Sequence, residues 1–116
     1  MAQESPKYIY KILPEAPPQP IPAVMDKSPL DAGDGFIHLS AAFQVPGTLG
    51  LFFKDATSVW LLKIEAGKLQ DPLKWEDTFP HLYGDLGARD VSDSKRFDRP
   101  DSKTWAEVMA GDSWLE

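Results

Sequence analysis

Hydrophobic and polar positions alternate in some stretches of the chain and cluster in others, which predicts several short strands and few helices. Residues 7–12 are rich in aromatic and β-branched positions and place two tyrosines and an isoleucine on one face, with two lysines and an isoleucine on the other, a pattern typical of a strand. Residues 59–64 form an almost unbroken apolar run, which favours a central strand buried on both faces. Further short strands are expected at 36–39, 74–76, 79–83 and 88–91.

Helices are expected in two places. Ser40 is a candidate N-cap for a helix over 41–53, which we expect to be interrupted at 46–47 by proline and glycine. A second, shorter helix is expected over 102–109, where apolar residues recur at helical spacing. Residues 95–100 are charged and indicate a turn. Short strands with few helices predict an α+β fold.

The length of 116 residues suits one domain with one core, so we expect a single compact domain over 1–116. Proline is frequent, and five of the eleven prolines fall within 14–22. This spacing forbids a regular strand and favours an extended loop. The loop is either a stiff surface connection or a flap over a pocket.

Charge and residue usage exclude several classes of function. The net charge is −6 and the basic residues are scattered, which argues against long nucleic acid as a partner. There is no cysteine, so disulfides, thiolate metal sites and cysteine nucleophiles are excluded. No apolar run approaches the roughly 20 residues that span a bilayer, and residues 1–6 lack a signal-peptide pattern. We therefore expect a cytoplasmic protein without membrane contact, monomeric or homodimeric.

The clearest functional signal is the run DGFIHLS, in which apolar residues are interleaved with groups that can do chemistry. Side chains on a strand alternate between its faces, so Phe36, His38 and Ser40 are expected on one face. The second of the two histidines, His81, lies far downstream in the run FPHLYG. Two histidines from separate strands can meet across one cleft.

Both histidines are candidate catalytic residues, since imidazole titrates near neutral pH and can donate, accept or move a proton. The alternative is that His38 and His81 are structural residues bonded to backbone. Tyr83 is a further candidate, as a proton donor or a stacking surface. Glu76 is the fourth, because the neighbouring ring of Trp75 can desolvate its carboxylate and raise its pKa; an exposed carboxylate is the alternative.

Other polar and aromatic residues are expected to bind the ligand in the same cleft. Ser40 lies only two positions from His38 and no G-x-S-x-G elbow is present, so a hydrolytic serine is not favoured. The expected ligand is a small molecule with an aromatic or nucleotide-like part. The candidate ligand-binding residues are Tyr10, Lys11, Phe36, Ser40, Gln44 and Thr48.

A metal site needs three or four ligands, which the two histidines with Glu76, Asp34 or Asp85 can supply in principle. The two histidines are 43 positions apart, which is not the close spacing that is usual for metal ligands. We therefore expect no metal.

Six runs in order give the chain a family resemblance: YIYKI, DGFIHLS, QVPGTLGLFF, VWLLKIEAGKL, LKWED and FPHLYGDL. In this order they resemble the DUF952 family of small proteins, over roughly Tyr8 to Val91. The resemblance implies a core over about 7–91 and a C-terminal helical extension over 92–116. It also implies a split β-sheet related to the ADP-ribosyltransferase-like fold, whose cleft holds NAD in distant relatives.

The motif order is also similar to that of the RNA 2′-phosphotransferases of that superfamily. Lys11 stands where such relatives often have histidine, and Glu76 is the nearest candidate for the transferase glutamate. NAD is therefore the cofactor that the resemblance implies for a transferase. The other hypotheses are a small-molecule isomerase, cyclase or lyase without a nucleotide, and a non-catalytic binding or structural module.

Overall fold

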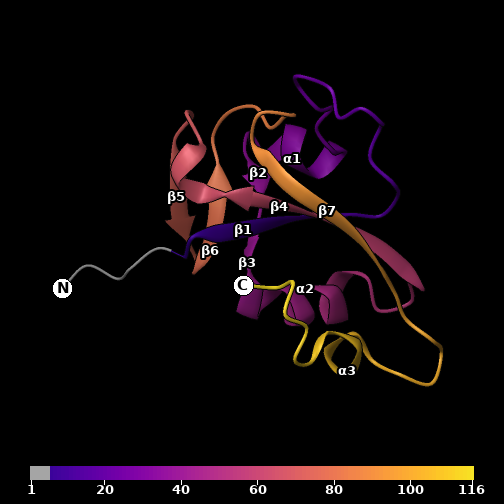
Figure 1. Cartoon of the computed structure of the whole chain (residues 1–116). Coiled ribbons are helices and arrows are strands. Elements are labelled where there is room, and N and C mark those ends of the chain that lie inside the picture. Colours follow the sequence, from indigo (N-terminus) through magenta and orange to yellow (C-terminus); the bar gives the residue numbers. More distant parts are fainter. Residues whose placement is uncertain (1–5) are drawn as a thin grey trace.

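The structure is a computed structural model that describes residues 6–116 (Figure 1). Within that range the chain forms short strands and short helices. The strands are β1 (Tyr8–Leu13), β2 (Ile37–His38), β3 (Ser40–Ala41), β4 (Ser58–Glu65), β5 (Leu73–Glu76), β6 (Phe79–Leu82) and β7 (Val91–Asp98). The helices are α1 (Pro29–Asp34), α2 (Val45–Phe52) and α3 (Trp105–Met109), with 3-10 turns η1 (Ala42–Gln44) and η2 (Ala66–Lys68).

The strands form two separate sheets. One has four strands in the order β3-β1-β4-β7 and the other has three in the order β2-β6-β5. All pairings between these strands are antiparallel. The predicted α+β fold of short strands with few short helices is confirmed, as is the buried central strand, because β4 lies between β1 and β7.

The four-stranded sheet has a core on each face, because alternate residues of β1 and β4 point in opposite directions. Tyr10 and Leu61 belong to the core that includes residues of α2 and α3. Ile9 and Leu62 belong to the core that includes β2 and β6. Figure 1 shows α2 and α3 together on one side, away from β2, β5 and β6.

The helices begin at different residues from those expected. Ser40 lies in β3, where it pairs with Tyr10 of β1, and it does not cap a helix. Pro46 lies in the first turn of α2, where its missing N–H costs no hydrogen bond, so it begins the helix and does not interrupt it. Thr104 caps α3 through a capping box with Glu107, so this helix starts after the expected position.

β7 is longer and more polar than the sequence suggested. The turn expected over 95–100 is wrong for its first residues, since the strand continues to Asp98. β7 is an edge strand whose charged side chains reach water, and only Phe97 is buried. The segment after Val91 is thus more than a helical extension: it completes the main sheet, and Trp105 packs in the same core as Tyr10.

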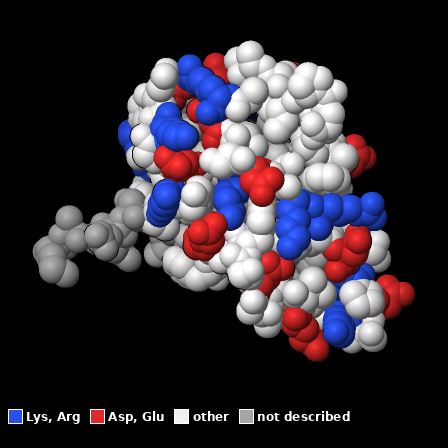
Figure 2. All heavy atoms as spheres, viewed as in Figure 1, with Lys and Arg blue, Asp and Glu red and all other residues white. Residues whose placement is uncertain are grey.

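The surface carries both signs of charge. On the face shown in Figure 2, lysine and arginine side chains are interspersed with aspartate and glutamate. In the described part of the chain, no helix is both long enough and apolar enough to cross a membrane.

Candidate functional site

The site begins at α1, whose sequence contains its own start and stop signals. Ser28 caps the helix by accepting a hydrogen bond from the backbone N–H of Asp31 at 3.1 Å, and Pro29 follows in the first turn. Gly35 ends the helix with a φ of 81°, a left-handed conformation that glycine adopts without strain. This short helix places Asp31 in the interior, with only 1% of the residue exposed.

The Asp31 carboxylate is bonded on both oxygens. Lys11 Nζ lies 2.6 Å from Oδ2, and His38 Nδ1 lies 2.6 Å from Oδ1. The backbone N–H of His38 also donates to Oδ1, at 3.2 Å. Burial by itself raises the pKa of Asp31, but the hydrogen bonds from Lys11 and His38 outweigh it and hold the pKa below its ordinary value.

The second nitrogen of His38 faces another carboxylate: Nε2 lies 3.0 Å from Asp34 Oδ2. A carboxylate oxygen only accepts hydrogen bonds, so a ring nitrogen of His38 that bonds to one of them is the donor. Each nitrogen of the His38 ring thus faces an acidic side chain, which orients the ring.

The second half of the site is the hairpin formed by β5 and β6. β6 pairs with β2 so that His81 lies opposite His38. The hairpin closes at Asp77 and Thr78, both with positive φ, at 52° and 71°. The buried side chain of Gln44 braces this turn, because its Nε2 donates to the Thr78 carbonyl at 2.6 Å.

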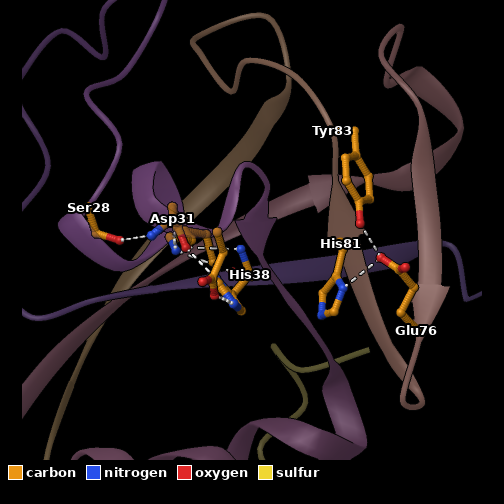
Figure 3. A network of polar contacts seen from close by, with 8 residues as sticks. Ser28, Asp31, His38, Glu76, His81 and Tyr83 are labelled. Carbon is orange, nitrogen blue, oxygen red and sulfur yellow. Dashed lines mark hydrogen bonds and ion pairs between the residues drawn. The ribbon is translucent and has the colours of Figure 1, made fainter.

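The hairpin brings Glu76, His81 and Tyr83 together (Figure 3). Glu76 Oε1 accepts a 2.5 Å hydrogen bond from the Tyr83 hydroxyl and lies 3.1 Å from His81 Nδ1. The bonds from Tyr83 and His81 lower the pKa of Glu76, so the raised pKa expected from Trp75 is wrong. The same bond to Glu76 raises the pKa of the Tyr83 phenol, which therefore stays protonated.

Phe36 joins the two halves through its ring. It stacks on His81 with ring centres 4.2 Å apart and tilts against His38 at 4.7 Å and Tyr83 at 5.2 Å. The two histidine rings meet edge to face, with centres 5.5 Å apart. His38 and His81 therefore lie side by side, but the cleft in which they were expected to meet is not one of the two open cavities of the molecule.

The structure brings together six of the ten candidate residues: Lys11, Phe36, His38, Glu76, His81 and Tyr83. Four lie apart from this group. Tyr10 points into the core of α2 and α3, the opposite face of β1 from Lys11. Ser40 lies in β3, beyond a break at Leu39; Gln44 braces the hairpin turn, and Thr48 lies in α2 with its hydroxyl buried and unbonded.

The group of six residues does not line either of two open cavities in the molecule, of about 500 and 490 Å³. The histidines are instead only partly exposed, His38 with 33% of its side chain and His81 with 12%. Within the described residues, no cluster of three or more histidine and acidic side chains is arranged to hold a metal ion.

Sequence reasoning missed the most connected residue of the site. Asp31 was not among the candidate residues, and Asp34 was considered for the site only as a metal ligand. The local signal was the Ser28-Pro29 helix start three residues before Asp31, which predicts a short helix with an acidic first turn. Its pairing with Lys11, 20 residues away, depends on the tertiary fold.

Comparisons with known proteins agree on the family and the fold. The profile of a family described as "Protein of unknown function (DUF952)" matches residues 19–94. A crystal structure of protein CC0527 from Caulobacter crescentus is 31% identical, with a TM-score of 0.71, and the match covers 89% of this chain and 98% of that one. A solution NMR structure of the same protein is 34% identical, with a TM-score of 0.66 and coverage of 84% and 90%. No curated protein sequence matches the chain.

Proposed function

The chain belongs to the DUF952 family, and we propose that in this member the two histidines form an acid–base site for a small molecule. The site would belong to a cytosolic isomerase, cyclase or lyase that needs no nucleotide cofactor. The observation that carries the proposal is that each histidine is oriented by its own acid, Asp31 for His38 and Glu76 for His81.

His81 is the residue proposed to move the proton. When Nδ1 donates to the Glu76 carboxylate, the neutral ring carries its lone pair on Nε2. A histidine held in one tautomer by a carboxylate is suited to general acid–base catalysis, because the reactive nitrogen has a fixed direction. The Tyr83 hydroxyl donates to the same carboxylate oxygen and so holds Glu76 in place.

His38 has a different proposed role. When both ring nitrogens donate to the carboxylates that face them, the ring is positively charged and has no lone pair left for a base. A fixed positive charge beside His81 can stabilise negative charge that develops on a substrate when a proton is removed. His38 would therefore anchor and polarise the substrate, and Lys11 would hold Asp31 ionised beneath it.

ADP-ribosyl or phosphoryl transfer is the second candidate, and with it the finer placement in the ADP-ribosyltransferase-like superfamily. It is favoured by Glu76, whose partly exposed carboxylate lies beside the rings of His81 and Tyr83. A carboxylate in such a position can stabilise an oxocarbenium-like centre. NAD would then be the cofactor, whereas the acid–base proposal requires none.

A purely structural role for the histidines predicts that both are buried and bonded to backbone. Against it, both side chains are partly exposed and bonded to carboxylates. In its favour, neither histidine lines one of the two open cavities. The experiment must therefore separate binding and catalysis from bracing.

The test is a thermal-shift screen of the wild type against NAD, ADP-ribose and a panel of small metabolites, followed by turnover assays on any ligand found. A ligand at a hundredfold excess over its Kd should stabilise the protein by about 2.7 kcal/mol. We expect a non-nucleotide metabolite to do so, and we expect His81→Ala and Tyr83→Phe to abolish or slow its conversion.

Tyr8→Phe is the matched control, because Tyr8 also loses one hydroxyl but lies in the other part of the molecule, packed against the core of α2 and α3. Its turnover should equal that of the wild type. Stabilisation by NAD alone would favour the transferase. Unchanged conversion in His81→Ala would rule out proton transfer by this histidine.

A further inference from the structure

A second site is indicated far from the histidines, in the cavity of about 500 Å³ between the end of α2 and the loop that joins β7 to α3. This volume is within the range of small-molecule pockets, about 300–1,000 Å³. Gly50 of α2 and Trp105 of α3 form part of its wall. A Cβ at Gly50 would have no neighbour within 4 Å, so this side of the cavity is open.

Lysine and arginine side chains that form no ion pair among the described residues are concentrated at this cavity. Seven of the 12 lysine and arginine side chains form ion pairs among the described residues, which leaves five. Three of those five, Lys54, Arg99 and Lys103, line the one cavity. In a chain with a net charge of −6, such a concentration of unpaired positive charge favours an anionic ligand.

Arg99 is held in place before any ligand arrives. Its Nε donates to the Ala56 carbonyl at 3.1 Å, and its Nη1 donates to the carbonyls of Pro100 at 3.3 Å and Lys103 at 2.9 Å. The guanidinium also lies over the Trp105 ring, 5.9 Å from its centre. These bonds leave Nη2 free to donate, and a fixed planar guanidinium suits a tetrahedral oxyanion better than a mobile ammonium does.

We propose that this cavity binds the phosphate group of a small molecule. Arg99 is the fixed donor, Lys54 and Lys103 close over the anion from the surface, and the Ser102 hydroxyl is available as a further donor. The wall also carries Asp55 and Asp101, so three cations against two carboxylates leave one net positive charge. The cavity exceeds the size of a bare phosphate ion, which leaves room for the organic part of the ligand.

The experiment is an NMR titration of the full chain with inorganic phosphate at low ionic strength, with acetate as a parallel arm. Saturable shifts of backbone amides are expected in residues 50–55 and 99–105 and not around His38 and His81. The double variant Lys54→Ala/Lys103→Ala should bind phosphate roughly tenfold more weakly, since it loses two charge-assisted contacts. Both lysines are exposed and without ion-pair partners among the described residues, so the variant should melt as the wild type does.

The control is Lys7→Ala/Lys68→Ala, which removes the same charge from exposed positions outside the cavity. It should retain wild-type affinity. The proposal would be overturned if both double variants lost phosphate affinity equally. It would also be overturned if the amide shifts spread over the surface and grew linearly with phosphate concentration, since phosphate would then only screen the surface charge. Binding of acetate as tight as that of phosphate would overturn the phosphate assignment. None of these readouts depends on the proposed histidine chemistry.

Discussion

The Asp31 carboxylate has almost no contact with water and depends on Lys11 and His38 for its hydrogen bonds. Replacing it with asparagine leaves the Lys11 ammonium, with only 14% of its side chain exposed, without a counter-charge. Removing one partner of a buried ion pair lowers stability more than the intact pair raises it, because the other charge is left buried without compensation. We expect Asp31→Asn to lower the free energy of unfolding by about 2–4 kcal/mol in urea denaturation.

Asp34→Asn is the matched control, because Asp34 also faces His38 but has 44% of its side chain exposed. Asp34→Asn should lower the free energy of unfolding by less than about 1 kcal/mol, as is usual for surface ion pairs. Equal costs for the two variants would mean that Asp31 gains nothing from burial and that α1 is held by other contacts.

The same residue determines part of the pH dependence of stability. The folded-state pKa of Asp31 lies below its ordinary value of 3.8, so its contribution is fully present above that pH and is lost as pH falls through the folded pKa. We expect the free energy of unfolding to fall below about pH 4, and to fall less steeply in Asp31→Asn. Urea denaturation at a series of pH values measures both slopes, and parallel slopes would contradict the assignment.

At the scale of single residues, the sequence indicated several side chains of the site but not the residues that they contact. The two histidines were expected to meet, but only the structure shows that their strands are neighbours. The alternation of strand side chains also shows that Tyr10 and Lys11 cannot share one cleft, although both were expected there. The acid partner Asp31 comes from another element, and no local pattern reports such a contact.

Among the elements, the β5–β6 hairpin carries visible strain next to the site. Thr78 has a φ of 71°, a left-handed conformation that is unfavourable for a β-branched residue. Glycine has no Cβ to clash there, although it costs more chain entropy on folding. We expect Thr78→Gly to raise the free energy of unfolding by about 0.5–1 kcal/mol, measured by urea denaturation.

Thr78→Ala is the control for this change, because alanine keeps the Cβ that causes the strain. It should gain less than the glycine variant. In both variants the hydrogen bond from Gln44 to the carbonyl of residue 78 is retained. A loss of stability in Thr78→Gly would mean that the threonine side chain stabilises the turn and that the hairpin is not strained.

Strands with a strong hydrophobic pattern could be predicted from the sequence. Strands whose bounds depend on contacts with other parts of the fold could not. β1 and β4 were expected within one or two residues of their bounds, since their apolar residues are buried in the sheet. The run at 36–40 was expected as one strand and a cap, but it divides at Leu39, whose N–H donates to the Pro80 carbonyl. The sequence of β7 is mostly polar, because side chains of this edge strand are largely exposed to water, and it was therefore expected in part to be a turn.

At the scale of the whole molecule, the C-terminal segment closes on the first strand. Trp114 packs against the rings of Tyr10 and Phe97, with centres 5.6 and 5.8 Å away. Its indole N–H donates to Asp93 Oδ2 at 2.8 Å, which lowers the pKa of that carboxyl. Lys63 Nζ lies 4.7 Å from the centre of the indole ring.

Tyr10 also bonds to the backbone of Trp114 and Glu116, 104 and 106 positions away, so the segment after β7 belongs to the same folding unit as β1. Trp114→Ala should therefore lower the free energy of unfolding by about 2–3 kcal/mol, somewhat less than for a fully buried tryptophan, while unfolding stays a single transition. Trp75→Ala is the control, since Trp75 is exposed and should cost much less. If Trp114→Ala were as mild as Trp75→Ala, or unfolded in two steps, the C-terminal segment would be an independent addition to the sheet, as the family resemblance implied.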